Sequence, residues 1–445
     1  MSDAALPLGG SGHRRVWSLT WPVVVANLTT PLVGVVDTAV MGRLPDAAYI
    51  GAVAVGAAIF NAVYWMFGFL RMGTTGLVAQ AFGARDSAEL VAVPIRAIGI
   101  GLTLGVLLVL LRQPLTDFML WIFSASATVE ELAESYVALR ILGAPALFTY
   151  LVVLGALFGL QRMGTALLIS VLLNVGNVVL SVTFVLGLGW GIEGVALATA
   201  ISEWLAATVG VLLLALRLRS HGGRRPRADA LLRRERLLAL TGMSLNLILR
   251  TLFVQLPFFA FTVLAAGFGD RILAANAVLM QMFFIMAYGL DALAHTAESL
   301  AGHAFGARDR AALRRAAGYT LLWSVLVALA ITLTYAVAGG AVIDLITTLP
   351  EVRATARDYL PWMLAAPLAA VGAFHLDGVF IGTTRITELR NSMFLAFVCY
   401  AVALWLALEP LGNHGLWLGM IVFMTARTVL LALLYPRLER MAEDR

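Results

Sequence analysis

Two carboxyl groups lie inside long apolar segments, where an ionised side chain is costly. Asp37 stands in the outer part of the segment 17–42, and Glu203 stands near the middle of 192–217, one helical turn after Thr199. Ionisable residues in such segments are functional unless they are paired for structure. A carboxyl group that is removed from water favours its protonated form, so both residues are candidates for taking up a proton near neutral pH.

Amide and hydroxyl side chains accompany these acids in the same half of the chain. Asn174, Asn177 and Ser181 are spaced i, i+3, i+7 and therefore share one helix face. Together with the acids they predict a polar pocket within apolar walls, whose carboxyl groups could take up protons. Two other interpretations stay open. The asparagines could only bridge neighbouring helices, and Glu203 could be the fixed partner of a buried cation.

A second group of charged or titratable side chains lies mainly in the C-terminal half, and we interpret it as a gate or a further coupling site. Three members share a helix face at spacings i, i+4, i+7. The alternative is that arginine–carboxylate pairs lock helices together, with Arg250 held by an acid of the segment 271–300. The candidates are Asp291, His295, Glu298, Arg71, Arg250, Asp377 and His375.

The elements that carry these residues follow from composition. Hydrophobic residues make up 61% of the 445 residues, charged residues 13%, and the mean hydropathy is +0.90, which excludes an ordinary water-soluble domain. Apolar segments of this length cross bilayers as helices, because a helix satisfies its own backbone hydrogen bonds. We therefore predict an all-α integral membrane fold with twelve spans, at about 17–42, 50–79, 91–112, 131–159, 164–188, 192–217, 237–266, 271–300, 316–339, 353–382, 391–409 and 414–435.

The basic residues predict the orientation. All 31 are arginines, and they are concentrated in the loops on one side and in the linker 218–236. The positive-inside rule then places both termini in the cytoplasm, so the high pI reflects topology and gives no argument for nucleic-acid binding. We interpret the linker as an ordinary cytoplasmic connection, although binding to lipid headgroups is an alternative. The predicted parts are a lobe over 1–217, the linker 218–236 and a lobe over 237–445.

A short repeat relates the two lobes. AFGARD occurs at 81–86 and again at 304–309, so the two copies are offset by close to half of the chain. Six spans on each side of the linker give parallel repeats, an arrangement used for alternating access. We expect the glycine of the motif to permit a tight turn, and its Arg–Asp pair to cap and anchor the loop.

Four stretches in this order resemble the multidrug and toxic compound extrusion (MATE) family, and most of all its DinF-like branch: PLVGVVDTAVMGRL at 31–44, FLRMGTTGLVAQAFGARD at 69–86, NVGNVVLS at 174–181 and LDGVFIGTTRITELRNSM at 376–393. The resemblance implies a V-shaped pair of six-helix lobes that exports organic, often cationic compounds in exchange for H⁺ or Na⁺. It also implies a C-lobe cation site, for which Asp377 is the best match. Where the family's archaeal-type pattern has a second carboxylate, this chain has Ser181, so Glu203 is our candidate for the second acid.

We therefore predict a secondary-active exporter and not an enzyme, with small amphipathic organic substrates and no cofactor. The sequence has no HExxH, GxxxxGK[ST] or nucleophile-elbow motif, so we expect an ion gradient to supply the energy in place of nucleotide hydrolysis. The predicted coupling ion is H⁺, with Na⁺ as the alternative. We expect a multi-pass protein of the bacterial inner membrane that contacts lipids and works as a monomer. Alternatives are a lipid-linked-sugar flippase, which would need more cavity cations, and an integral-membrane transferase using Asp291, His295 and Glu298.

Overall fold

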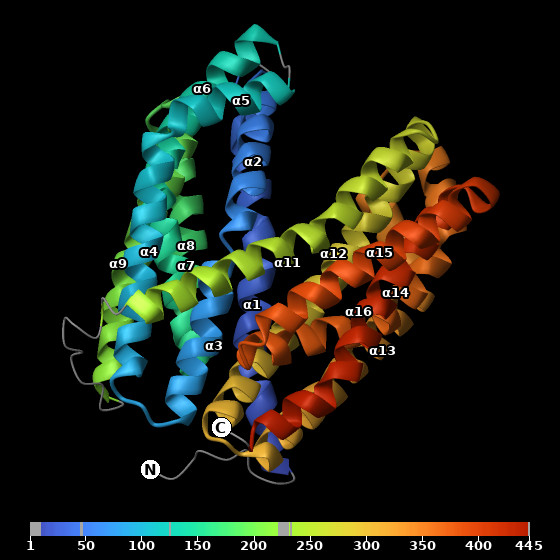
Figure 1. The fold of residues 1–445 in the computed structure, drawn as a ribbon. Helices are drawn as coiled ribbons and strands as arrows, with labels where there is room; N and C mark the ends of the chain where they lie inside the picture. Colours follow the sequence, from blue (N-terminus) through green and yellow to red (C-terminus); the bar gives the residue numbers. More distant parts are fainter. Residues whose placement is uncertain (1–9, 45–47, 124–125, 221–230, 232–233, 444–445) are drawn as a thin grey trace. The chain divides into compact units, whose positions relative to one another are not determined.

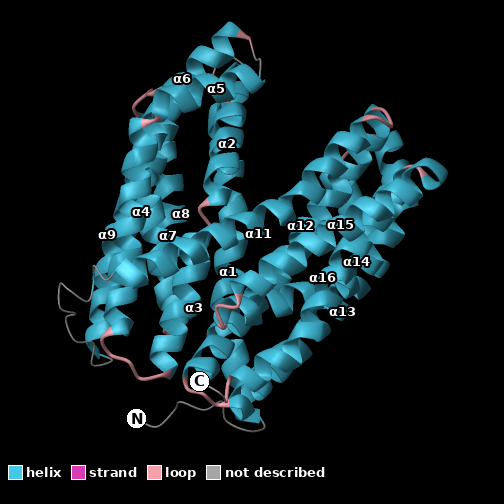
Figure 2. Cartoon of the chain, in the orientation of Figure 1, coloured by secondary structure: helices cyan, strands magenta, loops and turns pink. Residues whose placement is uncertain are grey.

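The computed structural model describes residues 10–44, 48–123, 126–220, 231 and 234–443. Within these ranges every regular element is a helix and no strand occurs (Figure 2). Twelve spans in the described ranges, each one helix or a pair of consecutive helices, are long and apolar enough to cross a membrane. This confirms the all-α membrane fold with twelve spans that the sequence predicts.

The chain forms two compact units, described separately here (Figure 1). The N-terminal unit is Trp21–Leu240, and the C-terminal unit combines Thr241–Arg445 with Met1–Thr20. The sequence-based division differs, since it assigns all of 1–217 to one lobe. Most of the linker 218–236 lies outside the described residues.

The chain begins with helix α1, whose first turns belong to the C-terminal unit and whose remainder belongs to the N-terminal unit. The first ten helical elements of the described chain follow in chain order. They are α1 (Gly10–Met41), α2 (Ala48–Met66), α3 (Phe69–Gly83), α4 (Glu89–Leu110), α5 (Arg112–Phe123), α6 (Ala127–Arg140), the 3₁₀ turn η1 (Ile141–Gly143), α7 (Ala144–Gly159), α8 (Met163–Val182) and the π-helical turn η2 (Thr183–Gly187). Helix α9 (Gly191–Ser220) is the last helix that lies wholly in the N-terminal unit, because α11 begins in that unit and continues in the C-terminal one. The later helices are α11 (Arg234–Ala266), α12 (Asp270–Gly306), α13 (Arg310–Ile346), α14 (Pro350–Gly382), α15 (Ile386–Leu411) and α16 (Asn413–Met441).

Backbone geometry repeats at the offset that separates the two AFGARD copies. Four non-glycine residues of the described chain have positive φ, and they form two pairs with this same offset: Arg85 with Arg308, and Gln161 with Thr384. Each follows the end of a helix, and the next amide donates to a carbonyl five residues back, as Asp86 N does to Ala81 O at 3.0 Å. This left-handed closure satisfies carbonyls that a helix end leaves without partners.

The turn in AFGARD therefore rests on a different residue from the one expected. Helices α3 and α12 continue through the motif as far as Gly83 and Gly306, and the left-handed position is the arginine two residues later. The predicted capping by aspartate is observed. Asp309 Oδ1 accepts from Ala312 N at 2.7 Å at the start of α13, which satisfies an amide at the helix N-terminus.

Paired glycines allow one helix of each unit to cross another at very short range. On α7, Gly155 packs against the backbone of Arg71 in α3, and on α14, Gly378 packs against the backbone of Ala294 in α12. The two contacts are equivalent, because both of their residues are related by the offset of the AFGARD copies. A second glycine follows one turn later in each helix, and Gly159 lies where a Cβ atom would be 2.8 Å from Ala79 N. Small residues spaced by four let helix backbones approach in membranes, where apolar burial adds little.

Some elements are not predicted from the sequence. Helix α5 occupies part of the region read as an outer loop, and Gln113 on it donates to Glu134 on α6 at 3.0 Å. The span 127–159 consists of α6 and α7 with η1 between them. Short 3₁₀ and π-helical turns in a membrane helix redirect the side chains that follow, which matters for the site described below.

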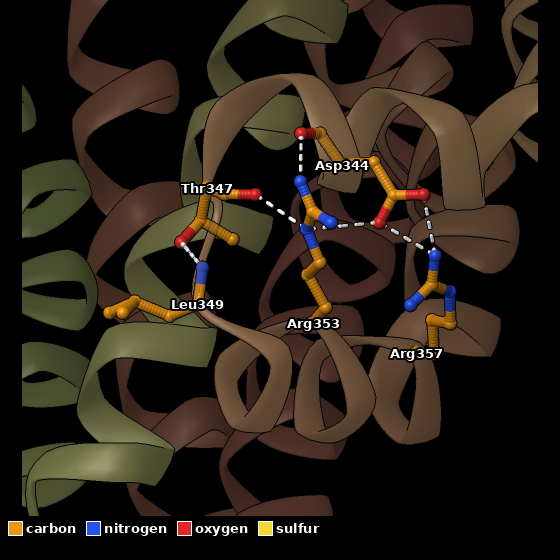
Figure 3. A network of polar contacts seen from close by, with 5 residues as sticks. All are labelled: Asp344, Thr347, Leu349, Arg353 and Arg357. Carbon is orange, nitrogen blue, oxygen red and sulfur yellow. Dashed lines mark hydrogen bonds and ion pairs between the residues drawn. The ribbon is translucent and has the colours of Figure 1, made fainter.

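The α13–α14 turn is held by two arginines of α14 (Figure 3). Arg353 donates from Nε to Thr347 O at 2.7 Å and from Nη2 to Asp344 O at 2.9 Å. Arg357 Nη2 contacts both carboxylate oxygens of Asp344, at 2.6 and 2.7 Å. Carbonyls at the end of α13 thus gain charged donors in place of helix partners.

The start of α1 is bound to the C-terminal unit. Trp323 on α13 donates from Nε1 to His13 Nδ1 at 3.1 Å, and its ring meets Trp17 edge-on at 5.1 Å. One turn later, the hydroxyls of Thr20 and Thr296 on α12 are 2.9 Å apart. The rest of α1, from Trp21, belongs to the N-terminal unit, so one continuous helix is part of both.

The glycine crossing of the C-terminal unit makes a stability prediction. Gly378→Ala places a methyl group against the Ala294 carbonyl, so we expect a loss of about 2 kcal/mol or more in the free energy of unfolding. Gly318→Ala is the matched control, since a Cβ atom there meets nothing within 4 Å and alanine is the better helix former by about 1 kcal/mol. Thermal unfolding in detergent compares the two. Equal melting temperatures would show that the α12–α14 crossing tolerates a wider separation.

Candidate functional site

Asp37 is buried in the N-terminal unit, with 8% of its surface exposed. It lies on the last turns of α1, and Ser181 Oγ on α8 donates to its Oδ1 at 3.1 Å. A hydroxyl is a neutral donor, so it stabilises the carboxylate less than a cation would. Ser181, which stands where the family pattern has a second carboxylate, is thus the hydrogen-bond partner of Asp37.

The amide face predicted on α8 joins three helices. Asn174 Nδ2 donates to Thr29 Oγ1 on α1 at 2.7 Å, and Asn177 Nδ2 donates to Thr199 Oγ1 on α9 at 2.8 Å. Both amides therefore bridge neighbouring helices, which agrees with the interpretation that the asparagines serve as helix–helix contacts. Asn177 Oδ1 is nevertheless buried without a hydrogen-bond partner among the described residues, one turn from Ser181.

Glu203 lies on α9, one turn after Thr199, and only 4% of it is exposed. Its Oε2 is buried and has no hydrogen-bond partner within the described chain. The same oxygen packs directly on Gly143, the last residue of η1, where a Cβ atom would overlap it. The break between α6 and α7 therefore makes room for the carboxyl group, and a buried acceptor left without a donor is available to a proton or a cation.

Arg140 is the residue of this site that sequence reasoning counted only as a basic residue within a span. It ends α6, donates from Nη1 to Tyr136 Oη at 2.7 Å, and its Cζ lies 4.5 Å from the centre of the Phe60 ring. Its charge interacts through space with Glu203 and Asp37, although no direct ion pair with either is found among the described contacts. A charge inside an apolar span was the signal that could have identified it.

Aromatic rings continue from Arg140 through the N-terminal unit. Tyr64 lies 5.0 Å from Phe60 and 5.7 Å from Phe148, and Phe67 stacks on Phe148 at 4.3 Å, all between ring centres. The Tyr64 hydroxyl is buried with no hydrogen-bond partner in the described chain. Two carboxyl groups, one guanidinium and these rings together can bind a proton or an organic cation.

The charged centre of the C-terminal unit is Asp377 on α14. Its Oδ2 accepts from Arg250 on α11 and from Arg427 Nη2 on α16, the latter at 2.6 Å. Arg427 also lies over the Phe423 and Phe374 rings, at 5.4 and 5.8 Å. The hypothesis that Arg250 is held by an acid of the eighth span is therefore wrong, because its carboxylate partner comes from the tenth.

The other predicted residues of this group lie on different helices. On α12, His295 Nδ1 and Glu298 Oε2 are 3.4 Å apart, while Asp291 interacts electrostatically with Arg427. Arg71 lies on α3 in the N-terminal unit, with its guanidinium 5.8 Å from the centre of the Phe158 ring. In the described chain, no group of three or more His, Cys, Asp or Glu side chains could hold a metal ion.

Comparison with known proteins identifies the family. The MatE family model matches twice, over residues 22–183 and 247–408, which together are more than half of the chain. The chain belongs to the MatE family. The two matches also show that each half carries one copy of the family's repeat.

Relatives of this MatE protein span its whole length. It is 40% identical to the DNA damage-inducible protein F of Escherichia coli strain K12, over 96% of this chain and 93% of the relative. It is 24% identical to the probable multidrug resistance protein NorM of Acinetobacter baylyi, over 97% of both chains. A crystal structure of the Vibrio cholerae MATE transporter VcmN in the bent form shares the fold, with TM-score 0.86, 21% identity, and 97% and 98% of the two chains covered.

Membership of the MatE family gives the general activity. Members are multidrug and toxic compound efflux transporters, so this protein is a transporter and not an enzyme. The bacterial relatives and the twelve apolar helices make it a multi-pass protein of the inner membrane. The transferase alternative is thereby removed.

The shared carboxylate of the C-terminal unit generates a prediction. Asp377→Ala leaves the buried cations of Arg250 and Arg427 without their acceptor, so we expect it to lower the free energy of unfolding by about 3–5 kcal/mol. Arg250→Ala should cost less, because the contact between Arg427 and Asp377 remains. The double variant should recover part of the sum of the two losses, measured by thermal unfolding in detergent.

A surface pair supplies the control for this cycle. Arg357 and Asp344 are both partly exposed, so Arg357→Ala should change stability by about 1 kcal/mol or less. Simple additivity of the Asp377 and Arg250 effects would mean that their contact contributes nothing to the fold.

Proposed function

We propose that this MatE protein exports amphipathic organic cations in exchange for H⁺, with Asp37 and Glu203 as the groups that bind both. The observation that carries the proposal is the pair of buried carboxyl groups in one unit, of which Glu203 Oε2 has no hydrogen-bond partner in the described chain. An ionised carboxyl in such surroundings needs a counter-charge. A proton and an organic cation both meet that need, so each excludes the other.

Exclusion of this kind is sufficient for antiport. A ligand shifts a conformational equilibrium only through its different affinity for the two states. When the proton and the substrate neutralise the same charge, a site facing outside takes up a proton as the substrate leaves. The site facing inside then releases the proton as a new substrate binds.

The surroundings of Asp37 suggest how charge loss reaches the backbone. Pro31 stands six residues earlier in α1 and has no amide hydrogen, so the helix there lacks one backbone hydrogen bond. Protonation turns the Asp37 carboxyl from an acceptor into a group that also donates. Its contact with Ser181 can then be exchanged for another, and the outer turns of α1 are the segment that would tilt.

The class of substrate is inferred from the aromatic rings around Arg140. Phe60, Tyr64 and Tyr136 present aromatic faces near Arg140, and such faces attract delocalised cations. Asp377, by contrast, already accepts from two arginines, which favours a structural role. Na⁺ coupling through Asp377 is the competing account that the first experiment tests.

The positive-inside bias supports both termini in the cytoplasm, and export then moves substrate away from that side. Each chain contains both copies of the family repeat, so we propose that one chain is the transporting unit, alternating its access between the two sides.

Imposed gradients test the coupling ion. In sealed vesicles loaded with ethidium, we expect efflux when a pH gradient is imposed alone, because protons compete with the dye at the two carboxyl groups. A Na⁺ gradient at equal pH on both sides should give no efflux above that of protein-free vesicles. Strict dependence on Na⁺ would defeat the proton proposal and move attention to Asp377.

Asp37→Asn tests the coupling residue. Asparagine imitates the protonated carboxyl with almost unchanged volume, so the variant should insert and fold normally. We expect gradient-driven efflux to fall by about a hundredfold or more, which is the lower end of the effects for a lost proton-transfer group. Cation binding should also lose its dependence on pH.

The matched control for this variant is Asp358→Asn, which changes an exposed aspartate of α14 in the same way. It should leave both transport and the pH dependence of binding as they are in the unmodified protein. Efflux by Asp37→Asn at the unmodified rate would show that Asp37 does not couple the proton.

A further inference from the structure

We propose that Arg140 is the specificity-determining residue of the N-terminal unit, a built-in cation that makes the site select singly charged substrates. This inference rests on the proposed function, because it assigns the charge of the substrate at the same two carboxyl groups. It concerns a residue that touches neither carboxyl directly and acts on them through its charge.

The ionised groups of the site carry a net charge of −1, which one monovalent ligand can neutralise. Arg140 donates to Tyr136 of its own helix, and the Glu203 carboxyl from α9 packs on Gly143, three residues after Arg140. Asp37 from α1 and Tyr64 from α2 are the other titratable groups of the described chain that interact with its charge. With both carboxyl groups ionised and both phenols neutral, the sum is two negative charges and one positive, or −1. One proton or one monovalent cation restores neutrality, whereas a divalent cation leaves +1 in a buried region, where uncompensated charge is costly.

Aromatic residues hold the Arg140 guanidinium in place, so its positive charge can stay near both carboxyl groups while ligands bind and leave. Tyr136 Oη accepts from its Nη1 at 2.7 Å, and the Phe60 and Tyr136 rings lie 4.5 and 5.5 Å from its Cζ. These three contacts fix the cation on aromatic faces without using either acid. Both carboxyl groups therefore remain available to ligands, while their charge is partly offset.

The residue type matters as much as its place. An arginine stays charged at every pH that the protein meets, whereas a buried lysine readily loses its proton. Arg140 consequently supplies a constant positive charge against which Asp37 and Glu203 exchange protons and substrate. Its aromatic contacts resemble those an organic cation would make, so the site contains one permanent cation and binds one more.

The alternative is that Arg140 only ties α6 to α2. A purely structural arginine would affect stability and overall affinity, but not the preference for one substrate charge over another. The comparison of two probes, the monocation tetraphenylphosphonium and the dication methyl viologen, separates the two roles. Binding is measured at equilibrium on the full-length protein in detergent, with no gradient imposed.

Arg140→Gln is the decisive variant, since glutamine keeps a donor for Tyr136 but removes the charge. The site then carries −2, so we expect the affinity for methyl viologen relative to tetraphenylphosphonium to rise about tenfold. Arg140→Lys should restore the original ratio only at acidic pH, where the lysine carries its proton. An unchanged ratio in Arg140→Gln would overturn the proposal.

The unmodified protein provides a test that does not depend on a variant folding. Calorimetry in buffers of different ionisation enthalpy counts the protons released when tetraphenylphosphonium binds, and we expect at most one. Release of two protons per monocation, or binding of methyl viologen as tight as that of tetraphenylphosphonium, would overturn the role of Arg140.

The same measurements distinguish a failure of the proposed carboxyl site from a failure of the role of Arg140. If Asp37→Asn binds tetraphenylphosphonium with unchanged affinity and pH dependence, the carboxyl site itself is wrong. If that variant loses the pH dependence while Arg140→Gln keeps the original ratio of affinities, only the role of Arg140 is wrong.

Discussion

Neutralising ionised side chains without water is the constraint on which this structure depends. In the C-terminal unit one carboxylate, Asp377, accepts from two arginines brought by α11 and α16, and the three charges tie three helices together. In the N-terminal unit two carboxyl groups share one arginine and none of the three makes a direct ion pair within the described contacts. In the first arrangement the carboxylate pairs with both arginines through Oδ2, although Asp377 Oδ1 is buried without a hydrogen-bond partner in the described chain. In the second arrangement the carboxyl groups have no such ion pair, and this difference is the reason for proposing the transport site in the N-terminal unit.

The two halves of the chain share their backbone contacts but not their buried charged side chains. The left-handed helix ends at Arg85 and Arg308 and the glycine crossings at Gly155 and Gly378 recur at one offset, so both units use the same helix contacts. The buried charged residues of the two clusters do not follow this rule. The position equivalent to Glu203 in the second half is Ala426, and the position equivalent to Arg427 in the first half is Trp204. Duplicated positions set the scaffold, and the departures from duplication give the two units different tasks.

The sequence predicts those site residues whose polarity differs from that of the apolar segment around them. Asp37, Glu203 and the amides of α8 are polar side chains in apolar helices, and periodicity within one helix shows which of them share a face. It does not show which helix that face meets. The partner of Arg250 was therefore assigned to the wrong span, since both α12 and α14 carry buried acids. Arg140 was visible as a charge, but its partners Phe60 and Tyr136 carry no polar signal that would mark them.

Backbone irregularities were the other part that sequence patterns did not provide. An apolar run from 131 to 159 gives no indication of the 3₁₀ turn η1, because apolar composition is the same in either helix type. Yet that turn places Gly143 where the Glu203 carboxyl needs space. Likewise the AFGARD motif suggested that glycine makes the turn. The left-handed position belongs to arginine instead, because the aspartate that follows caps the next helix and its amide closes the previous one.

Helix α1 connects these observations. Its first turns are fixed in the C-terminal unit by Trp323 and Thr296, while its last turns carry Asp37 in the N-terminal unit. A helix transmits displacement along its axis only where its hydrogen bonds are complete, and Pro31 removes one between the anchored end and the carboxyl. In the proposed mechanism, a change of charge at Asp37 therefore changes the shape of the outer turns of α1 and leaves its anchored first turns in place.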